Sequence, residues 1–67
     1  MSQPPNVIPI EDLDRLRFLQ RLDAAVHIDV TDWEAGFIEN LITGPRVLTP
    51  AQRNAIDKMR KEYEGRL

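Results

Sequence analysis

Apolar and polar positions follow a helical period in three stretches of the chain, most clearly over residues 30–45. On a helical wheel the apolar side chains of this stretch fill one contiguous half and the polar side chains the other, which is typical of a helix with one buried face. Thr31 and Glu34 predict a capping box at its start. Gly44, expected in the left-handed conformation, and Pro45 predict its end. The apolar half consists of Trp33, Phe37, Ile38, Leu41 and Ile42.

A second start signal lies at residues 49–52. Thr49 is a suitable cap, Pro50 suits the first helical position, and Gln52 follows the cap by three residues. The helix that begins here is predicted to run to about Glu64. Its apolar face is formed by Ala51, Ala55, Ile56, Met59 and Tyr63.

The first helix is expected to begin at Pro9 or Ile10 and to end at about Val26 or His27. Its apolar residues lie on two nearly opposite sides of the wheel: Ile10, Leu13 and Leu16 on one, and Phe18, Leu19, Leu22, Ala25 and Val26 on the other. A helix that packs on one neighbour needs a single stripe. Either the helix breaks near residues 16–18, or its second side is covered by another chain or by the N-terminal tail. The absence of Gly and Pro favours the second interpretation.

These stretches predict an all-α fold, a small three-helix domain over residues 9–67 that follows a flexible tail at residues 1–8. In the alternative arrangement the last two helices form a hairpin, and the first projects from it to pair with another chain. The expected core consists of Leu13, Leu19, Leu22, Val26, Trp33, Phe37, Leu41, Ile42, Leu48, Ile56, Met59 and Tyr63.

The composition limits the possible classes of protein. A chain of 67 residues makes at most one domain, and the absence of Cys excludes disulfides and thiolate metal sites. No signal peptide or membrane span is recognisable, so a cytoplasmic location is expected. The net charge of −2 is unevenly distributed. Residues 29–40 carry four acids and no base, whereas residues 46–67 carry six bases and three acids. Such a bipolar chain is suited to head-to-tail association or to an anionic partner.

Residues for catalysis or metal binding are scarce. The only Ser is in the tail, two of the three Thr are caps, and His27 has no Ser or Cys to activate. We therefore expect no enzyme activity, no catalytic residues and no cofactor. His27, Asp29 and Asp32 have a spacing that matches no metal-binding pattern, so no metal site is expected. At a helix C-terminus, His27 instead suits contact with exposed carbonyl groups.

Nucleic-acid binding is a competing interpretation, because the last two helices could form a helix-turn-helix. The phosphate contacts would then be Arg46, Arg53, Lys58, Arg60 and Lys61. However, the link between these helices is longer than the usual tight turn. The charges on the last helix also alternate in sign, and four pairs at i,i+4 spacing are expected to neutralise one another. These pairs are Arg53–Asp57, Asp57–Lys61, Lys58–Glu62 and Arg60–Glu64.

The pattern T-D-W-E-x-x-F-I-x-x-L at residues 31–41, followed by L-T-P-x-Q-x-x-x-I-x-x-M-x-x-x-Y at residues 48–63, resembles small helical proteins of phages and mobile elements. In these proteins a "WE..F" helix precedes an "LT..Q" helix. The resemblance covers the C-terminal half of the chain. It implies an accessory role in phage or plasmid biology, and it implies no catalytic residues.

The leading functional hypothesis is therefore a non-enzymatic protein-interaction module, such as a phage-type modulator of a host protein. Trp33 has two compatible interpretations, as a core residue and as an exposed interface anchor. The surplus apolar side of the first helix predicts a protein partner or a homodimer. The candidate interface residues are Ile10, Leu13, Leu16, Phe18 and Trp33.

Overall fold

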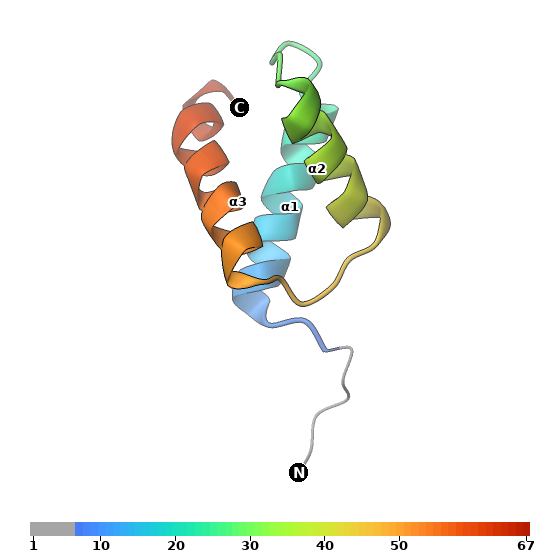
Figure 1. Cartoon of the computed structure of the whole chain (residues 1–67). Coiled ribbons are helices and arrows are strands. Elements are labelled where there is room, and N and C mark those ends of the chain that lie inside the picture. Colours follow the sequence, from blue (N-terminus) through green and yellow to red (C-terminus); the bar gives the residue numbers. More distant parts are fainter. Residues whose placement is uncertain (1–6) are drawn as a thin grey trace.

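The computed structural model describes residues 7–67 as three α-helices and one short 3₁₀ helix (Figure 1). The helices are α1 (Ile10–Ala24), α2 (Asp32–Thr43) and α3 (Pro50–Tyr63), and the 3₁₀ helix η1 spans Glu64–Arg66. The predicted all-α, three-helix fold is confirmed, and residues 7–67 contain no strand. Most of the predicted tail, residues 1–6, lies outside the described residues. Ile8, which was also assigned to the tail, packs against the core.

Local sequence signals account for the starts of α2 and α3. The Thr31 hydroxyl accepts a hydrogen bond from the Glu34 N–H at 3.1 Å, and the Glu34 carboxylate accepts one from the Thr31 N–H at 2.8 Å. Thr49 and Gln52 form the same reciprocal pair at 3.1 and 2.9 Å. Both predicted capping boxes are therefore present. Each satisfies backbone N–H groups that have no partner within the helix.

The three helices are arranged around α1. Figure 1 shows α1 between and behind the other two helices, and α2 and α3 each pack on it. Within residues 7–67 the backbones of α2 and α3 do not come into close contact with each other. The core lies where the two helices meet α1. Its fully buried side chains include Phe18 and Leu19 from α1, Ile38 and Leu41 from α2, and Ile56 from α3.

The two apolar sides expected for α1 are not fully opposed: Leu16 is buried with the second side, and only Ile10 and Leu13 of the first side are left over. Leu16, Phe18, Leu19 and Leu22 are all buried and form one wide arc, because α2 and α3 pack on α1 together and cover that arc between them. Leu19 lies between Leu16 and Phe18 on the wheel and joins the two sides. Only Ile10, 77% exposed, and Leu13, 38% exposed, remain outside this arc.

The predicted core needs further corrections. Leu13, Val26 and Trp33 are exposed, whereas Phe37 and Ile42 are only partly buried. Leu16, Phe18, Ile28 and Ile38 are buried but were not assigned to the core. The remaining assignments are confirmed: Leu19, Leu22, Leu41, Leu48, Ile56, Met59 and Tyr63 are all buried.

The C-terminal ends of α1 and α2 also differ from the prediction. α1 ends at Ala24, before Val26, because the following turn carries Ile28 back into the core and leaves Val26 94% exposed. Gly44 does not adopt the left-handed conformation but has φ −132° and ψ 68°. The next residue is Pro45, and a residue before proline is restricted to extended conformations near this φ.

Candidate functional site

Two neighbouring hollows lie between α2 and α3 on the surface of the described residues. A hollow of about 490 Å³ is lined by Thr31, Trp33, Glu34, Ala55, Lys58, Met59 and Glu62. A second hollow of about 370 Å³ is lined by Asp32, Trp33, Gly36, Phe37, Asn40, Leu41 and Gln52. Trp33 belongs to both. We call the two hollows together the α2–α3 groove.

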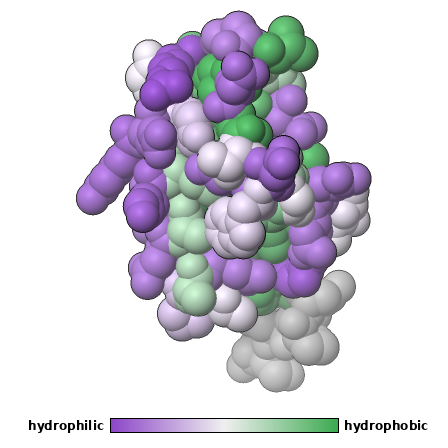
Figure 2. All heavy atoms as spheres, turned by 45° about the horizontal axis from the view of Figure 1, so that its top comes forward, coloured by the Kyte–Doolittle hydropathy of each residue, from purple (hydrophilic) through white to green (hydrophobic). Residues whose placement is uncertain are grey.

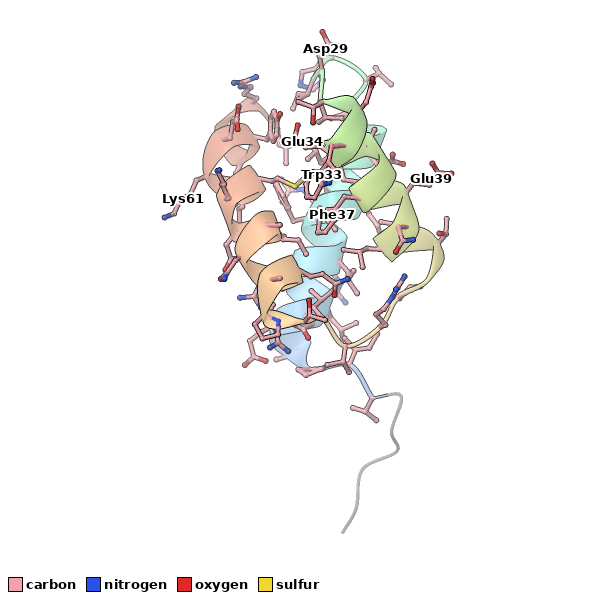
Figure 3. All side chains as sticks on the ribbon, viewed as in Figure 1. Asp29, Trp33, Glu34, Phe37, Glu39 and Lys61 are labelled. Carbon is pink, nitrogen blue, oxygen red and sulfur yellow. The ribbon has the colours of Figure 1, made fainter. Side chains whose placement is uncertain are left out.

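An aromatic pair from α2 divides this groove. The rings of Trp33 and Phe37 are stacked, with centroids 5.0 Å apart and planes inclined by 14°. Figure 3 shows both side chains directed into the space between α2 and α3, in front of α1. Phe37 is half-buried against the core, whereas Trp33 is 64% exposed. Phe37 lines only the smaller hollow, so the larger one lies against the part of Trp33 that Phe37 leaves open.

One side-chain hydrogen bond joins α2 and α3 beside the groove. The Tyr63 hydroxyl at the end of α3 donates to the Glu34 carboxylate in the first turn of α2, at 2.7 Å. Burial alone would raise the pKa of Glu34, but the hydrogen bonds from the Thr31 N–H and the Tyr63 hydroxyl outweigh it and hold that pKa below its ordinary value. Glu34 is therefore ionised at neutral pH and links the start of α2 to the end of α3.

The groove is bordered by more acids than bases. Asp32, Glu34 and Glu62 line the two hollows, whereas Lys58 is the one basic residue among the lining residues. Figure 2 shows green and pale atoms along the middle of one face, with purple atoms on both sides. An apolar strip flanked by polar residues is typical of a surface that binds another molecule.

The second feature is a hydrogen-bond network centred on Asp12, which the sequence did not predict. The Asp12 carboxylate is fully buried and accepts two hydrogen bonds from the Arg53 guanidinium, both at 2.9 Å. It also accepts one from the Leu48 N–H at 3.1 Å and one from Arg15 at 3.3 Å. Arg15 in turn donates to Asp57 at 3.0 and 3.3 Å. This network joins α1, α3 and the link that precedes α3.

Asp12 has a structural role, and its hydrogen bonds also set the pKa of its carboxyl group. Hydrogen bonding to Arg53 lowers the pKa of Asp12, burial opposes this, and the Leu48 N–H lowers it further, so the pKa lies below its ordinary value of 3.8. The sequence contained a signal for this position. Asp12, Leu16 and Leu19 follow the spacing i, i+4, i+7 and so share one helix face. Asp12 also lies in the first turn of α1, where the helix dipole favours an acid at the surface as well, so its position in the sequence does not by itself indicate burial.

The five basic residues proposed for nucleic-acid contact do not form one surface. Arg53 faces Asp12, and Arg60 donates to Asp14 at 3.0 Å and lies over the Phe18 ring at 5.4 Å. Arg46 folds back onto the Asn40 side chain at 2.8 Å. Lys58 lines the groove, and Lys61 points away from it (Figure 3).

The expected charge pairing along α3 is mostly wrong. Of the four i,i+4 pairs, the described residues form Arg60–Glu64, at 3.3 Å between Arg60 Nε and the carboxylate. Asp57 pairs with Arg15 instead, and Arg53 pairs with Asp12. The reason is that α3 turns Arg53 and Asp57 toward α1, where partners of opposite charge are available in a less solvated setting.

The candidate interface residues divide into two groups. Leu16 and Phe18 are 4% and 1% exposed, so they belong to the core of this chain and are not available at its surface. Ile10 and Leu13 are exposed together on α1 and line a hollow with Glu11, Asp14 and Arg17. Trp33 is exposed on α2, in the α2–α3 groove.

The remaining features predicted from the sequence concern His27, metal binding and membrane spans. His27 Nε2 lies 2.9 Å from the carbonyl oxygen of Arg66 in η1, a different helix end from the one expected. Across residues 7–67, no three His, Asp or Glu side chains gather into a group that could hold a metal ion. No helix in the same range is both long enough and apolar enough to cross a membrane.

Comparisons of the chain with family models, with curated proteins and with solved structures find no match.

Proposed function

We propose that this protein is a non-enzymatic protein-interaction module and that the α2–α3 groove is its binding surface. The observation that carries the proposal is the stacked Trp33–Phe37 pair, in which Trp33 is 64% exposed beside a hollow of about 490 Å³. Tryptophan is the side chain most enriched at the energetic centres of protein interfaces. A chain this small gains stability when such a residue is buried, so its exposure favours a role in binding.

The surroundings of Trp33 support binding in two further ways. Phe37 holds the indole from one side, so less side-chain freedom is lost when a partner packs on the other. The groove is bounded by helices rather than loops, which keeps the anchor in a defined position. The resemblance to accessory proteins of phages and mobile elements suggests a host protein as the partner.

The test is co-precipitation from a lysate of cells that encode the protein, with the wild-type chain, Trp33→Ala and Val26→Ala compared in parallel. Val26 is a matched control because it is 94% exposed and lines neither hollow of the groove. Truncating an interface anchor weakens binding by about 30-fold or more. A partner should therefore be captured by wild type and Val26→Ala and lost with Trp33→Ala.

Circular dichroism of the Trp33→Ala variant separates loss of binding from loss of folding. The variant should retain its helical spectrum, because Trp33 contributes little to the core. Capture of the same proteins by the folded Trp33→Ala variant would contradict the proposal.

A further inference from the structure

We propose that the α2–α3 groove accepts a positively charged segment of a protein partner, with a Lys or Arg side chain packed on the open part of the Trp33 indole. This inference rests on the proposed function and adds the chemistry of the partner. It is carried by the combination of an exposed aromatic surface and neighbouring acids that form no ion pair with a Lys or Arg of residues 7–67.

The acids of α1 and those of α2 differ in their surroundings. Asp12 and Asp14 on α1 are paired with Arg53 and Arg60 of α3. α2 carries Asp32, Glu34 and Glu39 and no basic residue. Within the described part of the chain, no Lys or Arg side chain lies within ion-pair distance of these three carboxylates. The charges of Asp32 and Glu39 are therefore available to a partner, whereas Glu34 already accepts hydrogen bonds from the Thr31 N–H and the Tyr63 hydroxyl.

Two of these acids, together with one from α3, border Trp33. Asp32 lines the smaller hollow, and Glu34 lines the larger one. Glu62 lines the larger hollow from α3, opposite Glu34. Figure 3 shows that Glu39 points away from the groove on α2 and that Lys61 points away from it on α3. Charge complementarity therefore favours a basic segment, although Lys58 shares the larger hollow.

The indole provides a second attraction for the same chemistry. A Lys ammonium or Arg guanidinium placed over a Trp face is attracted by the negative face of the ring, most strongly for Trp among the aromatic residues. Ala55 and Met59 form the apolar part of the larger hollow. This hollow suits the methylene stem of Lys or Arg or a neighbouring apolar side chain, while the charged end stays near the carboxylates.

The experiment is selection from a random peptide display library on the wild-type chain, with Trp33→Ala selected in parallel. Peptides enriched on wild type and not on Trp33→Ala should carry a net positive charge. The best peptide is then synthesised and titrated into the protein. Trp33 is the only tryptophan, so its fluorescence reports directly on occupancy of the groove. Affinity should fall between about 0.1 and about 1 M salt, as the Debye length decreases from about 10 Å to about 3 Å.

Charge variants provide the matched control. The double variant Asp32→Asn, Glu62→Gln should bind the peptide about fivefold more weakly, as expected for the loss of exposed ion pairs. Glu39→Gln removes a charge from the same helix outside the groove and should leave the affinity unchanged.

Enrichment of neutral or acidic peptides, the absence of any Trp33-dependent peptide, or equal affinity for the double variant would overturn the inference. In each case the proposed function still stands if the co-precipitated partner depends on Trp33. Self-association that Trp33→Ala abolishes would identify a second copy as the occupant and would also overturn it. Loss of the Trp33 dependence in the co-precipitation itself would remove the proposed function.

Discussion

At the scale of single residues, Asp12 and Trp33 occupy positions opposite to those their chemistry favours. A carboxylate is costly to bury unless it is paired and hydrogen-bonded. Asp12 meets that condition because Arg53, Arg15 and the Leu48 N–H supply its four hydrogen bonds. Trp33 stays exposed although burial of its large apolar surface would be favourable. The first residue explains how the helices are joined, and the second lies on the surface that we propose for a partner.

Replacing Asp12 with Asn should lower the free energy of unfolding by about 2–3 kcal/mol, since Arg53 and Arg15 lose the carboxylate that compensates them. Asp14→Asn is the matched control. It removes a carboxylate that is 62% exposed and paired with Arg60, and it should change the free energy by less than about 1 kcal/mol. Urea unfolding followed by circular dichroism measures both. Equal unfolding midpoints for the two variants would contradict the structural role of Asp12.

Acidification tests the same residue independently. Because the pKa of Asp12 is lowered in the folded protein, its ionised form stabilises the fold above pH 3.8, and this contribution is lost as the pH falls below that value. The dependence of stability on pH in this acid range should therefore be shallower for Asp12→Asn than for wild type. Parallel curves for the two proteins would mean that Asp12 has an ordinary pKa.

At the scale of the elements, α2 and α3 are positioned by α1 and by the hydrogen bond between their ends, while their backbones do not come into close contact with each other. Each packs on the buried arc of α1. The Tyr63–Glu34 hydrogen bond then connects the last turn of α3 to the first turn of α2. The capping box at Thr31 orients Glu34 for this bond, so a local signal in the sequence has a tertiary consequence.

The bond should be visible in the titration of Tyr63. The Glu34 carboxylate and burial raise the pKa of Tyr63 from 10.0 to about 12. Tyr63 is the only tyrosine, so phenolate absorbance reports on it alone. The absorbance midpoint should lie near pH 12 in the folded protein and near pH 10 in denaturant. A folded-state midpoint near pH 10 would show that the bond does not persist in solution.

The same shift predicts a loss of stability at alkaline pH. Between pH 10 and about 12 the unfolded chain releases the Tyr63 proton while the folded chain retains it, so stability falls as the pH rises through this range. Tyr63→Phe has no proton to release and should show a smaller decrease. The measurement is urea unfolding at several pH values for both proteins.

At the scale of the whole molecule, some charged side chains form ion pairs between α1 and α3, whereas those of α2 form none with other described residues. Arg15, Arg53 and Arg60 are paired with carboxylates between α1 and α3. What remains on α2 is negative, and the net charge of the chain is −2. Three of the nine Lys and Arg residues are therefore engaged in pairs between helices, and the unpaired acids of α2 oppose the approach of an anionic polymer.

We accordingly expect no retardation of duplex DNA in a gel-shift assay at low salt. A retarded complex that weakens steeply with salt and depends on Lys58 and Lys61 would contradict this expectation and favour the nucleic-acid interpretation. Lys58→Ala, Lys61→Ala serves as the variant, because neither lysine forms an ion pair with another described residue.

The apolar surface available for the predicted homodimer is smaller than the sequence suggested. Ile10 and Leu13 are exposed together on α1, whereas Leu16 and Phe18 are not available. We expect weak self-association through these two residues, since a stable interface usually buries about 800 Å² per partner. Light scattering should give a mass that rises with concentration for wild type and stays at one chain for Leu13→Asp. A wild-type mass of one chain at all concentrations would contradict the dimer.

The sequence alone determined the features that depend on neighbours along the chain. The three helices, the capping boxes at Thr31 and Thr49, and the buried residues of α3 follow from periodicity and local hydrogen bonding, so they could be predicted. The tertiary structure decided the features that depend on how α2 and α3 share α1. Their joint packing joins the two apolar sides of α1 into one arc, buries Asp12 in it, and draws Arg53 and Asp57 away from the pairs their spacing predicts. It also leaves Trp33 in an open groove, because a helical wheel shows which face of α2 is apolar but not how much of that face a neighbouring helix covers.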